Sequence, residues 1–161
     1  IIAKVNGPAI GLGCSLALFC DFIYATPRSK FADPHVSVGL VAGDGGCVMW
    51  PQLIGYARAK KFLLTGEIML ANDALEMGLI TEVVNEDKID EEVQELAEKL
   101  RDGAKYAIRW TKTSINAGLK VIANSIIDRA AAFENVTQLM EDHKIALQAF
   151  SDKEPPKFKQ K

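Results

Sequence analysis

The stretch from Val5 to Gly46 constrains the fold most, because glycine-rich turns alternate there with short apolar runs. Residues 1–5 and 22–25 are apolar or aromatic and bounded by turn residues, which predicts two buried strands. Between them, glycines at positions 7, 11 and 13 lead into the run from Leu16 to Cys20, for which we predict a helix buried on nearly all faces. Unpaired N–H groups at the start of that helix would converge on one point, which suits a developing oxyanion.

Separated motifs then follow in one register along the chain. VNGPAIGLGC, from Val5, is followed by LALFCDFIYATPRSKF, and TGEIMLANDALEMGLITEVV begins at Thr65. Their order and spacing resemble those of the crotonase superfamily, the enoyl-CoA hydratase/isomerase fold. The resemblance covers the whole chain and implies an α/β fold, with a crotonase-like β-β-α spiral followed by a C-terminal helical region.

The resemblance also implies how the chain is divided. Residues 1–103 correspond to part of the spiral core, and residues 104–161 to a C-terminal helical trimerisation region. The sequence opens inside a predicted strand, so we expect an N-terminal portion of the spiral to precede it. In the family that portion carries the second oxyanion donor and most contacts to coenzyme A.

The later part of the chain is predicted to be mostly helical. Residues 72–77 form a short helix that ends at Gly78, and a strand follows at residues 82–84. From Ile89 onward, apolar residues recur at helical spacing up to Met140. These apolar faces need a surface to cover, either on the chain's own spiral or on a neighbouring subunit, and the family's usual homotrimer or homohexamer favours the neighbour.

Composition excludes several classes of protein. Nineteen basic and 21 acidic residues give a net charge of −2, which argues against a nucleic-acid surface. No apolar run reaches the length of a membrane span. Three cysteines without C-x-x-C spacing and two histidines favour neither a disulfide framework nor a metal site. Unpaired cysteines fit a reducing compartment, so we expect a cytoplasmic location, with mitochondria as the alternative. The resemblance implies no cofactor, with coenzyme A only as part of the substrate.

The resemblance places one oxyanion donor at the backbone N–H of Leu12, between Gly11 and Gly13. Any residue can supply a backbone donor, so the leucine side chain does not remove this role. A tight turn that only starts a helix is the alternative interpretation of the same residues.

The acid/base positions depart from the hydratase pattern. Where the family has two glutamates, this chain has Ser15 and His35, so hydration by two carboxylates does not carry over. Asp44 follows His35 by nine residues and could complete a His–Asp dyad, although a helix cap is the alternative role for it. Asp33 is nearer in sequence, but it shares a face with His35 only if Pro34 does not bend the chain.

Two further residues have weaker assignments. Trp50 could line an acyl pocket, although its apolar surroundings favour the core. Lys153 matches a family position whose lysine approaches the coenzyme A phosphates from a neighbouring subunit, but Pro155 and Pro156 interrupt the usual pattern. We assign both, with Gly11, Gly13 and Ser15, to substrate binding.

Together these features predict an enzyme that acts on an acyl-CoA thioester through an oxyanion-stabilised enolate. Two alternatives stay open. The His35 to Asp44 spacing also occurs in C–C bond hydrolases of the superfamily, whose substrates would here be β-diketones or β-ketoacyl-CoA. The loss of a glutamate at Ser15 fits a non-catalytic acyl-CoA-binding homologue.

Overall fold

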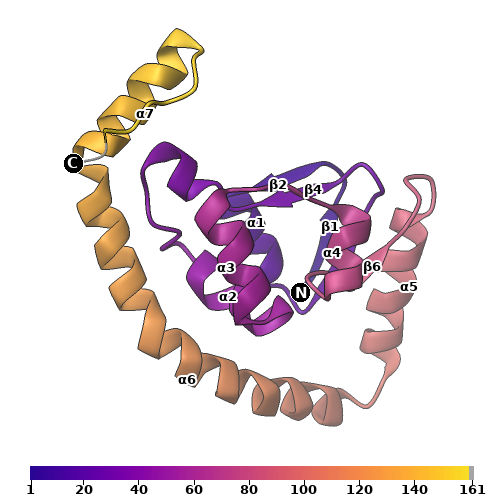
Figure 1. Cartoon of the computed structure of the whole chain (residues 1–161). Helices are drawn as coiled ribbons and strands as arrows, with labels where there is room; N and C mark the ends of the chain where they lie inside the picture. Colours follow the sequence, from indigo (N-terminus) through magenta and orange to yellow (C-terminus); the bar gives the residue numbers. More distant parts are fainter. Residues whose placement is uncertain (160–161) are drawn as a thin grey trace.

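The computed structural model describes residues 1–159, which form two small sheets, a layer of short helices and three longer C-terminal helices (Figure 1). The first sheet is parallel throughout, in the order β1 (Ile2–Val5), β3 (Phe22–Ala25) and β6 (Glu82–Val83). In the second sheet, β2 (Pro8–Ile10) runs parallel to β4 (Lys30–Ala32), and β4 runs antiparallel to β5 (Met69–Leu70).

The chain winds through these sheets as a spiral. It passes from β1 to β2 across Asn6 and Gly7, and returns through helix α1 (Leu12–Leu18) to β3 and then β4. The strands predicted at residues 1–5 and 22–25 are thereby confirmed, and they pair in register from Ile2 with Phe22 onward. The predicted burial of α1 on nearly all faces is wrong, because Leu16 is 62% exposed and only the opposite side of the helix packs on the core.

Short helices follow β4. They are η1 (His35–Val38), a 3₁₀ turn, and the α-helices α2 (Gly46–Ile54), α3 (Tyr56–Thr65) and α4 (Ala71–Met77). The predicted helix at residues 72–77 is confirmed, and Gly78 ends it in the left-handed conformation at φ 81°. Leu70 occupies the N-cap position of α4 and makes no side-chain capping bond.

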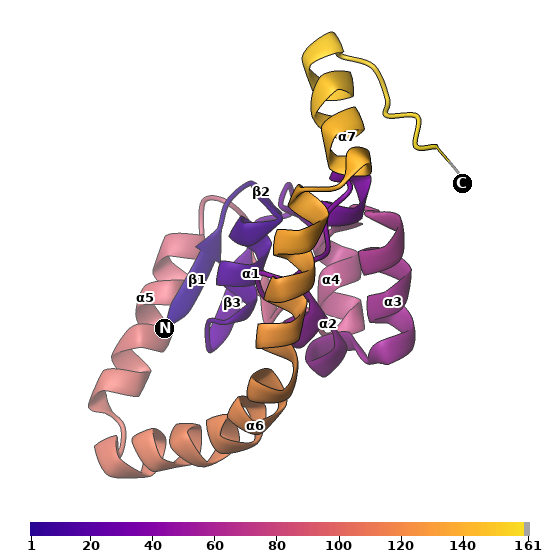
Figure 2. The same ribbon diagram turned by 90° about the vertical axis from the view of Figure 1, so that its left-hand side faces the viewer.

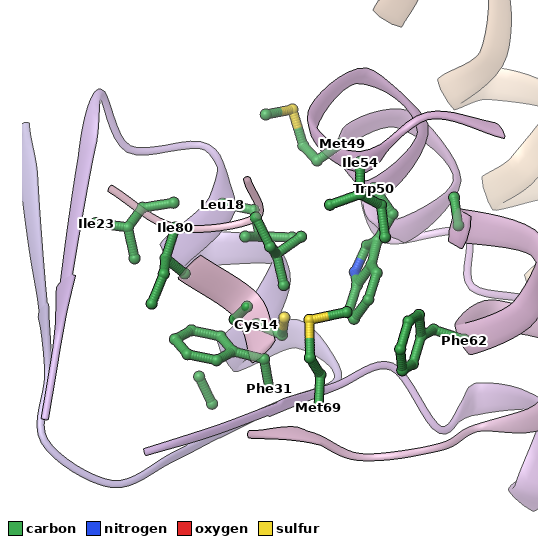
Figure 3. Close-up of a cluster of buried hydrophobic side chains, with 14 of the residues drawn as sticks. Cys14, Leu18, Ile23, Phe31, Met49, Trp50, Ile54, Phe62, Met69 and Ile80 are labelled. Atoms are coloured by element: carbon green, nitrogen blue, oxygen red, sulfur yellow. The ribbon is translucent and has the colours of Figure 1, made fainter. Parts of the chain in front are cut away.

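The core lies between the sheets and helices α1 to α4 (Figure 3). Trp50 of α2 is fully buried and packs against Phe62 of α3, with ring centroids 5.7 Å apart. Phe31 and Met69, from paired strands of the second sheet, close the core from the other side. Burial of each large side chain contributes roughly 1.5–3 kcal/mol, so this cluster fixes the strands that precede the site.

Three helices complete the described chain, namely α5 (Ile89–Asp102), α6 (Lys105–Gln138) and α7 (Glu141–Asp152). Helix α6 curves around the body of the molecule, and α7 continues from its end beyond η1 (Figures 1 and 2). Part of the predicted apolar stripe packs inward, with Ala130 buried, but Phe133 and Val136 remain 56% and 50% exposed. No helix within residues 1–159 is long and apolar enough to cross a membrane.

Candidate active site

A glycine turn starts α1 and leaves two backbone donors free. Gly11 has φ 56° and ψ −127°, a conformation that favours glycine, and its N–H donates to the Ala32 carbonyl at 2.9 Å. Its carbonyl accepts from the Cys14 and Ser15 N–H groups, which closes the first turn of the helix. Among the described residues, no acceptor pairs with the N–H of Leu12 or Gly13. Both residues are exposed, so this turn lies at the surface of the chain.

His35 packs against this turn. It is the first residue of η1, directly after β4 and Pro34, and its side chain is 13% exposed. A Cβ atom added to Gly11 would lie 3.7 Å from His35 Cε1. The imidazole therefore lies against Gly11, the residue that directly precedes the free donor of Leu12.

Asp33 holds the imidazole from behind. Its Oδ1 and the His35 Nδ1 are hydrogen-bonded, and the carboxylate is 1% exposed. The second oxygen, Oδ2, is buried without a partner among the described residues and lies against Gly46, where no Cβ atom would fit. Gly46 begins α2, so the helix dipole favours the negative charge of this carboxylate.

Asp44 faces the other nitrogen of the ring. Its Oδ2 lies 3.7 Å from His35 Nε2, too far for a direct hydrogen bond, and its Oδ1 accepts a bond from Ser15 Oγ at 3.0 Å. The structure thus brings His35, Asp44 and Ser15 together. The sequence-based choice of Asp44 to orient the ring needs correction, because the Nδ1–H of His35 donates to Asp33 and not to Asp44.

The helix-cap alternative for Asp44 is not observed either. The N-cap residue of α2 is Gly45, and within the described part of the chain no side chain caps the start of that helix. The carboxylate of Asp44 is instead turned toward Ser15 and His35. Its position next to the imidazole is therefore a feature of the site and not of the helix start.

Three carboxylates set the charge around His35. The bond to Asp33 is the largest influence and raises the pKa of His35 above 6.5; burial of the ring opposes it, and Asp33, Asp44 and Glu134 add their negative charges. Glu134 comes from α6, and its Oε2 lies 2.7 Å from the position of a Cβ on Gly43. Glu134 was not among the predicted site residues, because a helical stripe does not show which of its members reaches a loop much earlier in the chain.

The nearby thiols are not activated. Burial, with a smaller contribution from Asp33, raises the pKa of Cys14 to about 12, and burial also raises the pKa of Cys47. A thiolate is the reactive form of cysteine, so neither residue is a nucleophile at neutral pH.

Asp33, His35 and Asp44 could each offer one metal-ligand atom within 4.8 Å of the others. However, the His35 Nδ1 is already committed to the bond with Asp33. A ring held by a carboxylate on one nitrogen and free on the other suits proton transfer.

The remaining two predicted site residues lie apart from this cluster. Trp50 is fully buried in the core, as the alternative interpretation of that residue expects, and does not reach the surface. Lys153 is exposed at the end of α7, where it adopts a left-handed conformation at φ 58°. Within residues 1–159, the Lys153 side chain forms no hydrogen bond or ion pair with His35 or with the glycine turn.

Comparison with known proteins identifies the family. The sequence model described as "Enoyl-CoA hydratase/isomerase" matches residues 1–161. The chain belongs to the enoyl-CoA hydratase/isomerase family. A relative from Clostridioides difficile named "Short-chain-enoyl-CoA hydratase" is 39% identical over 128 residues, which cover 80% of this chain and 82% of the relative. "Crotonyl-CoA hydratase" from Syntrophomonas wolfei is 34% identical and is matched over 98% of this chain and 61% of its own length.

Solved structures of the family share the fold. An enoyl-CoA hydratase from Mycobacterium avium subsp. paratuberculosis superposes with a TM-score of 0.93 at 30% identity, over 99% of this chain and 65% of that one. A carnitinyl-CoA dehydratase from Mycobacterium avium gives a TM-score of 0.92 at 31% identity, covering 64% of its chain. The predicted fold class is confirmed. The chain spans about three fifths of the length of several curated relatives that it matches, and the comparisons lend no support to the hydrolase or binding-protein alternatives.

Proposed function

We propose that the protein acts on an acyl-CoA thioester, most simply a 2-enoyl-CoA, by stabilising the thioester enolate at the Gly11–Gly13 turn. One observation carries the proposal: the imidazole of His35 packs against Gly11, and the free N–H of Leu12 follows Gly11 in the same turn. An oxyanion donor and a proton donor on adjacent sides of one turn are what enolate chemistry requires. The names of the relatives support the substrate class.

The pair of His35 and Asp44 would divide the proton transfers of hydration. The 3.7 Å between Nε2 and Oδ2 suits a substrate water that bridges the two groups. Asp44 would take a proton from that water as its oxygen bonds to the β-carbon. The imidazolium of His35 would give its Nε2 proton to the α-carbon, so that water is added across the double bond, and the proton on Asp44 would then return to His35.

The surrounding residues have supporting roles in this proposal. Asp33 keeps the imidazolium charged and oriented, because its carboxylate bonds to Nδ1 and leaves Nε2 free for the substrate. Ser15 is 1% exposed, so its hydroxyl positions Asp44 and does not contact the acyl chain directly. Gly11 and Gly13 let the thioester approach the Leu12 N–H. No other cofactor is needed for these steps, and coenzyme A enters as part of the substrate.

We further infer that a homotrimer or homohexamer forms through residues 104–161. Large apolar side chains on α6 and α7 stay exposed in the single chain, among them Trp110 at 68%, Val121 at 71% and Phe150 at 82%. Apolar patches of this kind mark protein–protein contacts. Lys153 would meet coenzyme A phosphates only from such a neighbouring subunit. A single-chain mass in sedimentation velocity would count against this assembly.

The proposed reaction is tested by hydration of crotonyl-CoA with the full-length protein. The loss of enoyl absorbance measures the rate. His35→Gln should lower kcat by about 10²–10⁴-fold, because it removes the proton donor. Binding of the saturated analogue butyryl-CoA should change little in this variant. Equal turnover by the variant and the wild type would rule out the proposed role of His35.

A further inference from the structure

The C-terminal helices lie behind the loop that joins His35 to Asp44. The end of α6 and the start of α7 sit beside η1 (Figure 1), and packing contacts join α7 to η1 and α6 to α2. Residues 40–45 belong to no helix or strand. The position of Asp44 relative to His35 therefore depends on a few contacts made by this loop.

Two hydrogen bonds tie the loop to the C-terminal helices. His143 Nδ1 lies 2.7 Å from the Val38 carbonyl oxygen, which can only accept, so this nitrogen carries the hydrogen. The Val41 N–H donates to Thr137 Oγ1 at 3.3 Å. One anchor comes from α7 and the other from α6, and together they hold both ends of the segment 38–41.

Close backbone packing supports the same segment. Gly39 has φ 69°, and a Cβ atom added to it would lie 2.7 Å from the His143 backbone nitrogen and 2.8 Å from the Asp142 carbonyl carbon. A Cβ on Gly43 would lie 2.5 Å from the Ala130 carbonyl oxygen. No side chain fits at either glycine, so the helices rest directly on the loop backbone.

We propose that His143 and Thr137 are positioning residues of the active site, which hold the loop so that Asp44 stays beside His35 Nε2. The inference deepens the proposed function and depends on it for the kinetic readout only. Neither residue touches the reacting atoms. Their effect would reach the chemistry through the separation of the His35 and Asp44 side chains.

The effect can be measured at His35 itself. Its imidazole signal is identified as the one that is absent from the spectrum of His35→Gln, and it is then followed in the His143 variants. The comparison is between His143→Asn and His143→Ala. The asparagine amide nitrogen can occupy the place of Nδ1 and donate to Val38, whereas alanine cannot. Both variants are uncharged at this position, so the hydrogen bond is the only intended difference.

The readouts are the NMR titration of His35 and the turnover of crotonyl-CoA. The charged groups that face His35 are Asp33, Asp44 and Glu134. If the loop relaxes in His143→Ala, Asp44 moves away and the pKa of His35 falls, because one of the carboxylates that raise it is weakened. The loss of one hydrogen bond should lower kcat about two- to tenfold with little change in KM. His143→Asn should restore both quantities.

Two further comparisons complete the test. Lys144→Ala, on the exposed neighbour of His143, should change neither quantity. Thr137→Val should act like His143→Ala, and Thr137→Ser, which keeps the hydroxyl, should act like the wild type. An unchanged His35 titration and kcat in both His143→Ala and Thr137→Val would overturn the proposal, as would a lower melting temperature without a shifted titration. A shifted titration in a protein that turns over no acyl-CoA would keep the positioning role and refute the proposed function.

Discussion

Replacement of Asp33 by asparagine tests the electrostatic design of the site most sharply. The substitution keeps the shape of the side chain but removes the charge that holds His35 Nδ1. A hydrogen bond between charged groups contributes about 1.5–3 kcal/mol. If this energy is fully expressed in the transition state, kcat falls about 10-fold to about 150-fold.

The pH dependence has a definite direction. The wild-type pKa of His35 is raised above 6.5, mainly by Asp33, so the protonated acid persists to higher pH than in an ordinary histidine. In Asp33→Asn the pKa of His35 falls. The limb of the kcat profile on which activity is lost with rising pH should therefore move to lower pH.

The free energy of unfolding should also depend on pH through His35. Because the folded pKa of His35 is above the unfolded value, its contribution to stability is complete below about pH 6.5 and is lost as pH rises through the folded pKa. Urea unfolding of the wild type should show this decrease, and Asp33→Asn should show less of it. Asp33→Asn also loses the interaction of the carboxylate with the N-terminus of α2, which should lower the free energy of unfolding by about 0.3–1 kcal/mol more.

A matched control separates these effects from a general loss of charge. Asp128 is exposed on α6, and Asp128→Asn also removes one carboxylate. It should leave the kcat profile and the pH dependence of unfolding unchanged. If Asp33→Asn kept kcat within twofold and did not move the falling limb of the profile, the assignment of Asp33 as the group that holds His35 charged would be wrong.

Three other outcomes follow from the structure. Leu12→Pro removes the proposed oxyanion N–H at the first helical position, where proline is tolerated, so kcat should fall roughly 10²–10³-fold with a nearly unchanged melting temperature. Leu12→Ala keeps the N–H and is the control, and equal kcat values in the two variants would contradict the proposed role of this donor. Gly46→Ala places a Cβ against Asp33 Oδ2, so a thermal melt should show a lower melting temperature and an activity assay a lower kcat. Wild-type values of both would contradict the importance of this close contact. Cys14, with a pKa of about 12, should resist maleimide in the native protein at pH 8 and react after unfolding. Mass spectrometry measures the labelling, and rapid labelling of the native protein would contradict the burial of this thiol.

Much of the fold could be predicted because its signals are local. Residues 2–5 and 22–25 carry strand-forming side chains between turns, and Gly78 marks the end of α4. The second sheet was not predicted, because strands of two or three residues such as β5 are defined by their partners and not by their own pattern. The exposure of Leu16 was missed for a related reason, since an apolar run does not show which of its faces the fold covers.

The sequence predicted several residues of the site but not the hydrogen bonds between them. Their nine-residue spacing suggested that His35 and Asp44 lie close together, and His35 Nε2 is indeed 3.7 Å from Asp44 Oδ2. Asp33 and His35 were expected to meet only if Pro34 left the chain straight, and this expectation was wrong. Pro34, with φ −88° and ψ 26°, turns the chain into η1, and the His35 ring is hydrogen-bonded to Asp33 across that turn. Glu134 is brought in by the curved path of α6, which no spacing in the sequence reports.

If a thioester enolate forms at the Gly11–Gly13 turn with His35 as the proton carrier, the protein should exchange α-protons of a bound saturated acyl-CoA with solvent. Exchange of the α-protons of butyryl-CoA in D₂O, measured by mass spectrometry, tests it without dependence on the full reaction. We predict exchange with the wild-type protein, and its loss in both His35→Gln and Leu12→Pro. Butyryl-CoA that binds to the wild type but exchanges no α-proton, or exchange that persists in both variants, would contradict the account.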